Sequence, residues 1–405
     1  MLDSYRAVLT LPGALSFSLA GLLGRLPISM IGLGLVLLVQ HVTGSYGAAG
    51  VVSAAYVLGN AAFAVVGGRL IDRYGQSRVL PIAMVISCLA LAGTVAVVVT
   101  EQPAPLPHLL AALAGATMPQ VGSCVRARWA FLLNRDGRLH TAFSYEAVMD
   151  ETVFILGPTL VTVLATAWHP VAGLVTAIVC GLIGGLGLAA QRSTEPPTRP
   201  ATRRGEIRIP MPWALLAILI GVSAMLGAVF GGAEVATVAF ADEQGRKAWA
   251  GPLLGIWAFG SLLAGLAFGA ASFRIPRRAQ FQRAATALGV SLVPLPFLGS
   301  VWLLGPVLLL AGLAISPTLI TLTGLVEEHV PAPRLTEGLA VVHSGMAFGV
   351  ALGAAVVGYV VDHAGASASY GVVITAGAIG AILAWTLPDR SAPDRRTPPL
   401  AEVPA

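Results

Sequence analysis

Several ionisable side chains stand inside long stretches of otherwise apolar sequence. Four sites are prominent: Arg25; the group Glu146, Asp150 and Glu151; Glu234; and His343. A charged side chain surrounded by hydrocarbon costs a few kcal/mol or more, so each of these residues needs a partner or a task. The tasks that fit such residues are proton transfer, binding of a charged solute and permanent pairing between helices.

Arg25 lies eleven residues into the first apolar stretch. At about 1.5 Å per residue, this places it roughly 16 Å along a helix. Pro27 follows closely and predicts a kink or a broken turn. We interpret Arg25 either as an anchor for a solute and partner of a titrating carboxylate, or as a permanent ion pair that locks helix packing.

Asp150 and Glu151 lie in the first half of one apolar stretch. Adjacent residues of a helix point about 100° apart, so one of the two carboxylates can face a cavity while the other faces a neighbouring helix. Their depth is similar to that of Arg25, which predicts a pair of Arg25 with Asp150 or Glu151. Such a carboxylate can carry a proton if its partner can leave. The alternative is a structural pair with Arg126 or Arg128.

Three further polar residues in the apolar stretches, Glu234, His343 and Gln120, are candidate functional residues. Glu234 either faces a cavity, where a cationic solute would suit it, or lies near the membrane surface. His343 either titrates near pH 7 or is a hydrogen-bonded packing residue. Gln120 is one of few amides in the apolar stretches, and we place it in the cavity with Arg25 and Glu234.

The composition shows what must position these residues. Of 405 residues, 56% are hydrophobic and only 11% are charged, whereas soluble proteins carry about 25% charged residues. This predicts an all-α membrane protein with many spanning helices. The basic residues gather in short loops without a basic face of interleaved aromatics, so no nucleic-acid partner is expected. Cys88, Cys124 and Cys180 lie in apolar stretches, so we expect neither a disulfide nor a metal site.

Twelve segments are long enough to cross a bilayer, which takes roughly 20 residues each. We place them near 14–40, 48–70, 79–100, 107–128, 143–167, 170–190, 212–240, 249–272, 284–303, 305–327, 337–361 and 366–387. A weak repeat about 200 residues apart indicates two pseudo-symmetric six-helix bundles. The expected organisation is a first bundle, a polar linker, a second bundle and a disordered tail, at 1–190, 191–211, 212–388 and 389–405.

The distribution of basic residues predicts the orientation. If the N-terminus is cytoplasmic, all 24 Lys and Arg residues except Arg25, Arg246 and Lys247 lie on the cytoplasmic side. Loops rich in Lys and Arg stay on that side of the membrane. We therefore expect an inner (plasma) membrane protein with several spans and both termini in the cytoplasm.

A charged turn joins the second and third segments, and its sequence is a motif. Gly68, Leu70, Asp72, Arg73, Gly75 and Arg78 fit the pattern G-x-L-a-D-R-x-G-R-R-x-x-L, while Gln76 and Ser77 replace its basic pair. The stretch resembles the loop between helices two and three of the major facilitator superfamily. An ordinary basic hairpin is the alternative. The resemblance implies that Gly68, Asp72, Arg73, Gly75 and Arg78 form a latch that closes the cytoplasmic side.

A second motif lies in the fifth segment. Gly157 and Pro158 are similar to the core of the superfamily's helix-five signature of antiporters, whose flanking glycines are replaced here by Val153, Val161 and Thr162. An arginine common in helix four of proton-coupled exporters is absent, because Ala111 stands in its place. Arg25 is the candidate to serve instead.

The resemblance implies a transporter that works by alternating access. Proton-coupled efflux of small amphipathic compounds is the leading prediction, and uptake of a small metabolite such as a sugar or an organic acid is the alternative. The expected partners are a small-molecule substrate, protons and the lipid bilayer, with a monomeric chain and no cofactor. No motif of an intramembrane enzyme is present in the sequence, so no catalytic activity is expected.

Overall fold

The computed structural model describes residues 2–133, 138–198, 211–270, 274–331 and 334–388. All regular elements in these ranges are helical. The α-helices are α1 (Leu2–Leu9), α2 (Ala14–Thr43), α3 (Tyr46–Tyr74), α4 (Gln76–Val99), α5 (Leu106–Thr117), α6 (Val121–Leu132), α7 (Leu139–Ala167), α8 (Ala172–Ala190), α9 (Trp213–Glu243), α10 (Ala250–Ala270), α11 (Arg277–Leu292), α12 (Val301–Gly312), α13 (Ile315–His329), α14 (Leu335–Ala364) and α15 (Ala366–Trp385).

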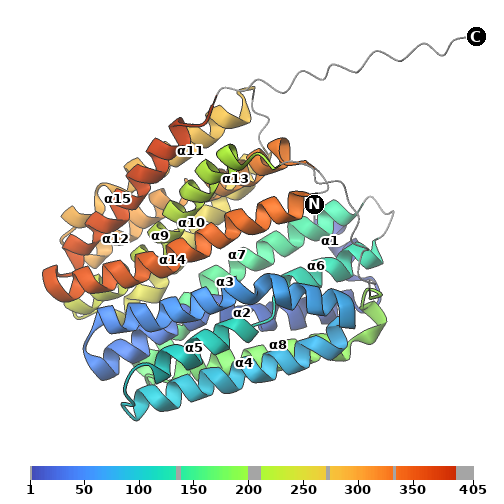
Figure 1. The fold of residues 1–405 in the computed structure, drawn as a ribbon, viewed down its shortest axis with the longest axis horizontal. Helices are drawn as coiled ribbons and strands as arrows, with labels where there is room; N and C mark the ends of the chain where they lie inside the picture. Colours follow the sequence, from blue (N-terminus) through green and yellow to red (C-terminus); the bar gives the residue numbers. More distant parts are fainter. Residues whose placement is uncertain (1, 134–137, 199–210, 271–273, 332–333, 389–405) are drawn as a thin grey trace, which may run out of the picture.

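Ten helical segments of the described chain are long and apolar enough to cross a membrane. The pair α5–α6 and helix α11 supply the two remaining apolar segments. The first group of helices, α2 to α8, lies beside the second group, α9 to α15 (Figure 1). The fold is therefore the two-bundle membrane architecture that the sequence predicts. Within the first bundle α2 packs against α7 and α8, and within the second α9 packs against α14 and α15.

The fourth apolar segment is not the single helix expected at 107–128. It breaks between α5 and α6 at Met118, Pro119 and Gln120. Pro119 has no N–H to continue the hydrogen-bond ladder, so carbonyls in the preceding turn lose their helical partners. Asn60 of α3 compensates, because its Nδ2 donates to the carbonyl of Gly115 at 3.2 Å and to that of Met118 at 3.4 Å.

The boundary expected at Leu304–Pro306 is also wrong. Residues 304–306 lie inside α12, and the chain instead turns between α11 and α12, where Pro294 and Pro296 interrupt the helical pattern. Ser300 then starts α12 by accepting a hydrogen bond from the Trp302 backbone N–H at 3.3 Å. Pro294 and Pro296 thus mark the end of the preceding helix, whereas the single Pro306 is accommodated inside α12.

The charged turn between α3 and α4 is shorter than expected. Asp72 and Arg73 belong to the last turn of α3, and Gly75 alone separates the two helices, with φ 92°. Asp72 therefore does not cap a helix start. A Cβ added at Gly67 or Gly68 would meet no atom of the described residues within 4 Å, so neither glycine is a site of close helix packing here.

The two bundles contact one another along two helix pairs, α3 with α14 and α7 with α10. We call the end where α3 begins the Asp362 end, and the end where α3 finishes the Asp72 end. Asp362, near the end of α14, accepts hydrogen bonds from the Tyr46 and Gly47 backbone N–H groups, both at 2.8 Å, and from Ser45 Oγ at 2.6 Å. The bundles are thus joined at the Asp362 end.

The expected linker and tail fall partly or wholly outside the described residues. These include Arg199, Arg203, Arg204 and Arg208 of the linker and all of 389–405. The division at 1–190, 191–211 and 212–388 stays a prediction.

Candidate functional site

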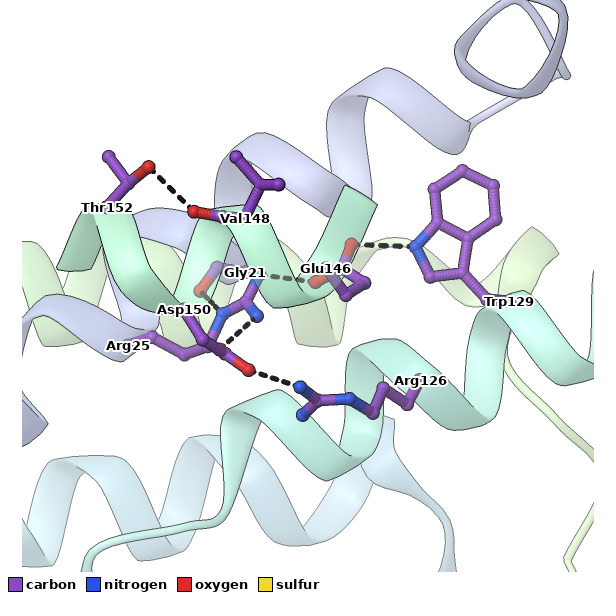
Figure 2. Close-up of polar contacts among 8 residues, drawn as sticks. All are labelled: Gly21, Arg25, Arg126, Trp129, Glu146, Val148, Asp150 and Thr152. Carbon is purple, nitrogen blue, oxygen red and sulfur yellow. Dashed lines mark hydrogen bonds and ion pairs between the residues drawn. The ribbon is translucent and has the colours of Figure 1, made fainter. Parts of the chain in front are cut away.

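Arg25 occupies the centre of a buried ion network in the first bundle (Figure 2). Its side chain is 5% exposed, and its Nη1 lies 2.7 Å from Asp150 Oδ1. Its Nη2 lies 2.6 Å from Glu146 Oε2 as an ion pair, and its Nε donates to the Gly21 carbonyl at 3.0 Å. The guanidinium of α2 is thereby held against α7 by two carboxylates. The predicted pairing of Arg25 with Asp150 is present in this geometry.

Asp150 is shared between two arginines. Its second carboxylate oxygen contacts Arg126 of α6. A missing side chain makes room for this arrangement, since a Cβ at Gly122 would lie 3.3 Å from Arg126 Nη1 and 3.4 Å from Arg25 Cδ. Asp150 thus pairs with both Arg25 and Arg126, which the sequence analysis considered as alternatives.

Glu146 is a member of the network to which the sequence interpretation gave no role. It is fully buried, and its Oε1 accepts a hydrogen bond from Trp129 Nε1 at 2.7 Å. The signal was present, because Glu146 and Asp150 are four residues apart and therefore share one helix face, while Glu151 points elsewhere. Removing one member of a buried ion pair leaves an uncompensated charge and costs about 3–5 kcal/mol.

A cavity of about 220 Å³ borders this network. Arg25, Arg126 and Asp150 line it, together with Gln120 from the break in the fourth segment. Gln120 Nε2 also donates to Asn60 Oδ1 at 3.2 Å. The remaining lining is mostly apolar: Ile28, Met118, Pro119, Val121, Val153 and Phe154. A charged site beside apolar walls suits an amphipathic solute.

The other predicted residues lie outside this network. Glu151 is partly buried and makes no hydrogen bond or ion pair within the described part of the chain. His343 is exposed, and its Nδ1 contacts the Leu339 carbonyl of its own helix at 2.8 Å. Asp72, Arg73 and Arg78 are exposed at the Asp72 end, with Arg73 over the Tyr74 ring at 5.1 Å.

Arg128 forms a separate, fully buried anchor at the end of α6. It donates to Gln76 Oε1 at 2.8 Å, to the carbonyls of Leu188 and Gln191, and to Thr194 Oγ1 at 2.7 Å. It therefore ties the chain after α8 to the start of α4 and does not pair with Asp150.

Gly157 and Pro158 of α7 lie where α7 meets two other helices. Gly157 packs directly on Ser29 of α2, whose Oγ donates to the Val153 carbonyl at 2.9 Å. On the opposite side the Pro158 carbonyl packs on Gly251 of α10. The motif therefore places a close-packed stretch of α7 between its own bundle and the other one.

Comparison with known proteins identifies the family. The model of the Major Facilitator Superfamily matches residues 17–336 and 248–405. The chain belongs to the Major Facilitator Superfamily. No curated protein matches the sequence.

Solved structures of transporters in this superfamily show the same fold. The bacterial homologue of the iron transporter ferroportin in an inward-facing state is 16% identical, with a TM-score of 0.68 over 92% of this chain and 98% of the other. A mutant of the nucleoside transporter NupG is 17% identical, with a TM-score of 0.67 over 92% and 98%. The D-xylose–proton symporter is 16% identical, with a TM-score of 0.67 over 92% and 96%.

Proposed function

We propose that this major facilitator transporter is proton-coupled and exports small amphipathic compounds by alternating access. Membership in the superfamily makes the chain a membrane transport protein and not an enzyme. The proposal therefore concerns the direction of transport, the coupling ion and the solute. It also includes a monomeric chain in the inner membrane with both termini in the cytoplasm. The distribution of basic residues supports this orientation of the termini.

The observation that carries the proposal is the position of Asp150 between Arg25 and Arg126 on the wall of a cavity. The charged groups around it are those two arginines, from α2 and α6, with Glu146 and Glu151 on its own helix. Protonation of Asp150 removes the negative charge that both guanidinium groups share. Arg25 then keeps Glu146 alone, and the contact between α2, α6 and α7 loosens.

The apolar lining supports an amphipathic solute over a sugar, because sugar sites need many hydrogen-bonding side chains. The second candidate is uptake of an organic acid. It is favoured by one observation: Arg126 borders the cavity with 38% of its side chain exposed, and a guanidinium in this position can bind a carboxylate.

The motif of α3 would close the Asp72 end in the opposite state. At the Asp362 end, Gly50 packs on Ala354 and Ala355, and Gly358 packs on Tyr46. The two helices run antiparallel, so extending this register brings Gly68 beside Glu337 and Arg69 beside the start of α14. Gly68 would then supply the close approach that it lacks in the present state.

Transport in everted membrane vesicles tests the function. Efflux activity should appear as uptake of an amphipathic dye that requires a pH gradient and collapses with an uncoupler. A double variant with Asp150→Asn and Glu151→Gln should lose the dependence on the pH gradient, and Glu327→Gln serves as a control on a carboxylate outside the network. Dye uptake that follows the pH gradient equally well in the double variant contradicts the proposal.

A further inference from the structure

Glu234 is a carboxylate between the two bundles, and it has no partner within the described residues. It makes no hydrogen bond or ion pair there. Its Oε1 lies 3.6 Å from the position of a Cβ added to Gly32 of α2, and the same Cβ would lie 3.6 Å from Ser53 Oγ of α3. The absent side chain of Gly32 therefore leaves space beside the carboxylate.

Two positions of α9 border this space. From Leu226 to Ala241 every residue is buried except Phe230 and Glu234, which are partly exposed. They are four residues apart and thus lie on one face of the helix. On α2, Ile28 lines the cavity beside Arg25, and Gly32 follows one turn later on the same face. The space at Glu234 therefore lies about one helical turn of α2 from the cavity lining, toward the Asp362 end.

An aromatic pair lies one helical turn from the carboxylate, because Phe230 of α9 packs on Trp257 of α10. The rings of Phe230 and Trp257 have centroids 5.3 Å apart with an interplanar angle of 50°. Trp257 is 5% exposed, and its Nε1 is buried without a hydrogen-bond partner in the described structure. A buried polar atom of this kind is costly unless a ligand or water satisfies it. The site thus offers a negative charge and aromatic surface.

We propose that Glu234, Phe230 and Trp257 bind the cationic group of a lipophilic organic cation. The inference rests on the proposed function and specifies its substrate class. Delocalised cations are attracted to carboxylates and to aromatic faces, and both attractions strengthen away from water. Because the site lies between the bundles, a bound cation contacts α2, α3, α9 and α10 together.

Proton binding and cation binding compete at Glu234. The facing stretches of α10 and α14, at 250–269 and 346–357, contain no titratable residue. On the other helices packed around α9 the titratable residues next along the chain are Arg25 and His41 of α2, Tyr46 and Tyr56 of α3, Asp242 of α9, and Tyr370 of α15, which hydrogen-bonds to Thr237. A protonated Glu234 is neutral and loses its attraction for the cation, which gives exchange of a proton for a cation.

The test uses two probes of equal shape and opposite charge, tetraphenylphosphonium and tetraphenylborate. Binding to the purified full chain in nanodiscs is measured by equilibrium dialysis at several pH values. Tetraphenylphosphonium should bind about tenfold more tightly than tetraphenylborate, which corresponds to about 1.4 kcal/mol. Its affinity should fall as the pH is lowered. Glu234→Gln should abolish both effects, and Glu234→Asp should retain part of each.

Glu327→Gln is the matched control, because it removes an exposed carboxylate of α13, outside the cavity, while leaving Glu234 in place. It should not weaken tetraphenylphosphonium binding. Tighter binding of tetraphenylborate that is lost in Arg126→Gln overturns the inference and assigns an anion to the arginine pair. Equal cation binding by wild type and Glu234→Gln also overturns it.

The two proposals fail separately. If tetraphenylphosphonium binds as expected but no solute moves with a pH gradient, the proposed function is wrong and the cation site stands. If dye efflux follows the gradient but the cation does not bind, the site is wrong and the transport function stands. Cation binding in nanodiscs requires no pH gradient, so it can be measured independently of transport.

Discussion

The two ends of the interface between the bundles differ in their contacts. At the Asp362 end, glycines of α3 and α14 pack backbone against backbone, and the Asp362 carboxylate takes three hydrogen bonds from the start of α3. At the Asp72 end Gly67 and Gly68 of α3 meet open space, and Asp72 and Arg73 are exposed. The same pair of helices is therefore sealed at one end and separated at the other.

This difference assigns a task to each set of residues. A transporter that alternates must break the contacts at one end before or while it forms them at the other. The joined end shows which contacts break, namely the Asp362 bonds and the glycine packing. The open end shows which residues remain to form contacts, and these are the members of the α3 motif. Variants at each end should therefore shift the equilibrium in opposite directions.

The largest effect is expected from Gly50→Leu. A Cβ at this position would lie within 3 Å of the Ala354 carbonyl carbon, so a leucine must push α3 away from α14. Overpacking of this kind costs about 1–3 kcal/mol, which would shift the equilibrium by roughly five- to 150-fold toward opening of the Asp362 end. Opening of this end is measured as the rate at which a membrane-impermeant reagent alkylates the cysteine of a Ser53→Cys variant. Gly371→Leu, which meets open space on α15, is the control, and equal alkylation rates in the two variants would refute the assignment.

Gly68→Leu should act in the opposite direction and more weakly. Nothing lies within 4 Å of an added Cβ, so the present state and the melting temperature should be unchanged. Closure of the Asp72 end would be obstructed, which should lower the transport rate about tenfold, as expected for overpacking by roughly 1.4 kcal/mol. The rate of dye transport and the melting temperature together check this. Normal transport in Gly68→Leu would show that α3 and α14 never approach there.

Asp362→Asn should open the Asp362 end by a smaller amount. An amide keeps the size of the side chain but replaces charge-assisted bonds to the start of α3 with weaker ones, a loss of about 1 kcal/mol. Accessibility at Ser53 should rise roughly fivefold, following that free energy. Glu243→Gln is a matched control, since Glu243 likewise binds a helix start, the Ala366 N–H at 2.7 Å, but within one bundle. Glu243→Gln should lower the melting temperature without changing the accessibility at Ser53. A similar rise of this accessibility in both variants would mean that overall stability, and not the Asp362 contacts, controls opening.

Asp72→Asn should have the smallest effect on the present state, because Asp72 is exposed at the open end. We expect an unchanged melting temperature and unchanged accessibility at Ser53. Transport should slow severalfold, since closure of the Asp72 end loses a charged contact worth up to about 1 kcal/mol at a solvated surface. Undiminished transport in vesicles would exclude a latch role for Asp72.

The sequence predicted the fold and the position of Arg25 well, because both follow from local patterns. Apolar length gives the spanning helices, and a guanidinium deep in such a helix requires a carboxylate at similar depth. Depth alone predicted a pairing with Asp150 or Glu151, and only the folded chain shows that Asp150 is the partner. Glu146 was missed as a partner although the spacing of four residues would have found it, whereas Glu151 was included through adjacency in the sequence.

Other features could not be obtained from local patterns. The Asp362 contacts join residues more than 300 positions apart, and nothing near Asp362 in the sequence indicates which helix start it binds. The break at Met118–Gln120 depends on Asn60, a residue of another helix. The packing of Gly157 on Ser29 likewise depends on the register of α2 against α7. These features are tertiary contacts between residues far apart in the sequence, so local sequence patterns do not predict them.

The most direct test measures both ends of the interface in one molecule. Spin labels at Val51 and Val356 report the Asp362 end, and labels at Arg69 and Glu337 report the Asp72 end, with Cys88, Cys124 and Cys180 replaced by alanine. Electron–electron resonance distances should change in opposite directions when Gly50→Leu is introduced: the first pair lengthens and the second shortens. Two distances that lengthen together, or a second distance that never changes in an actively transporting protein, would contradict alternating access between these ends.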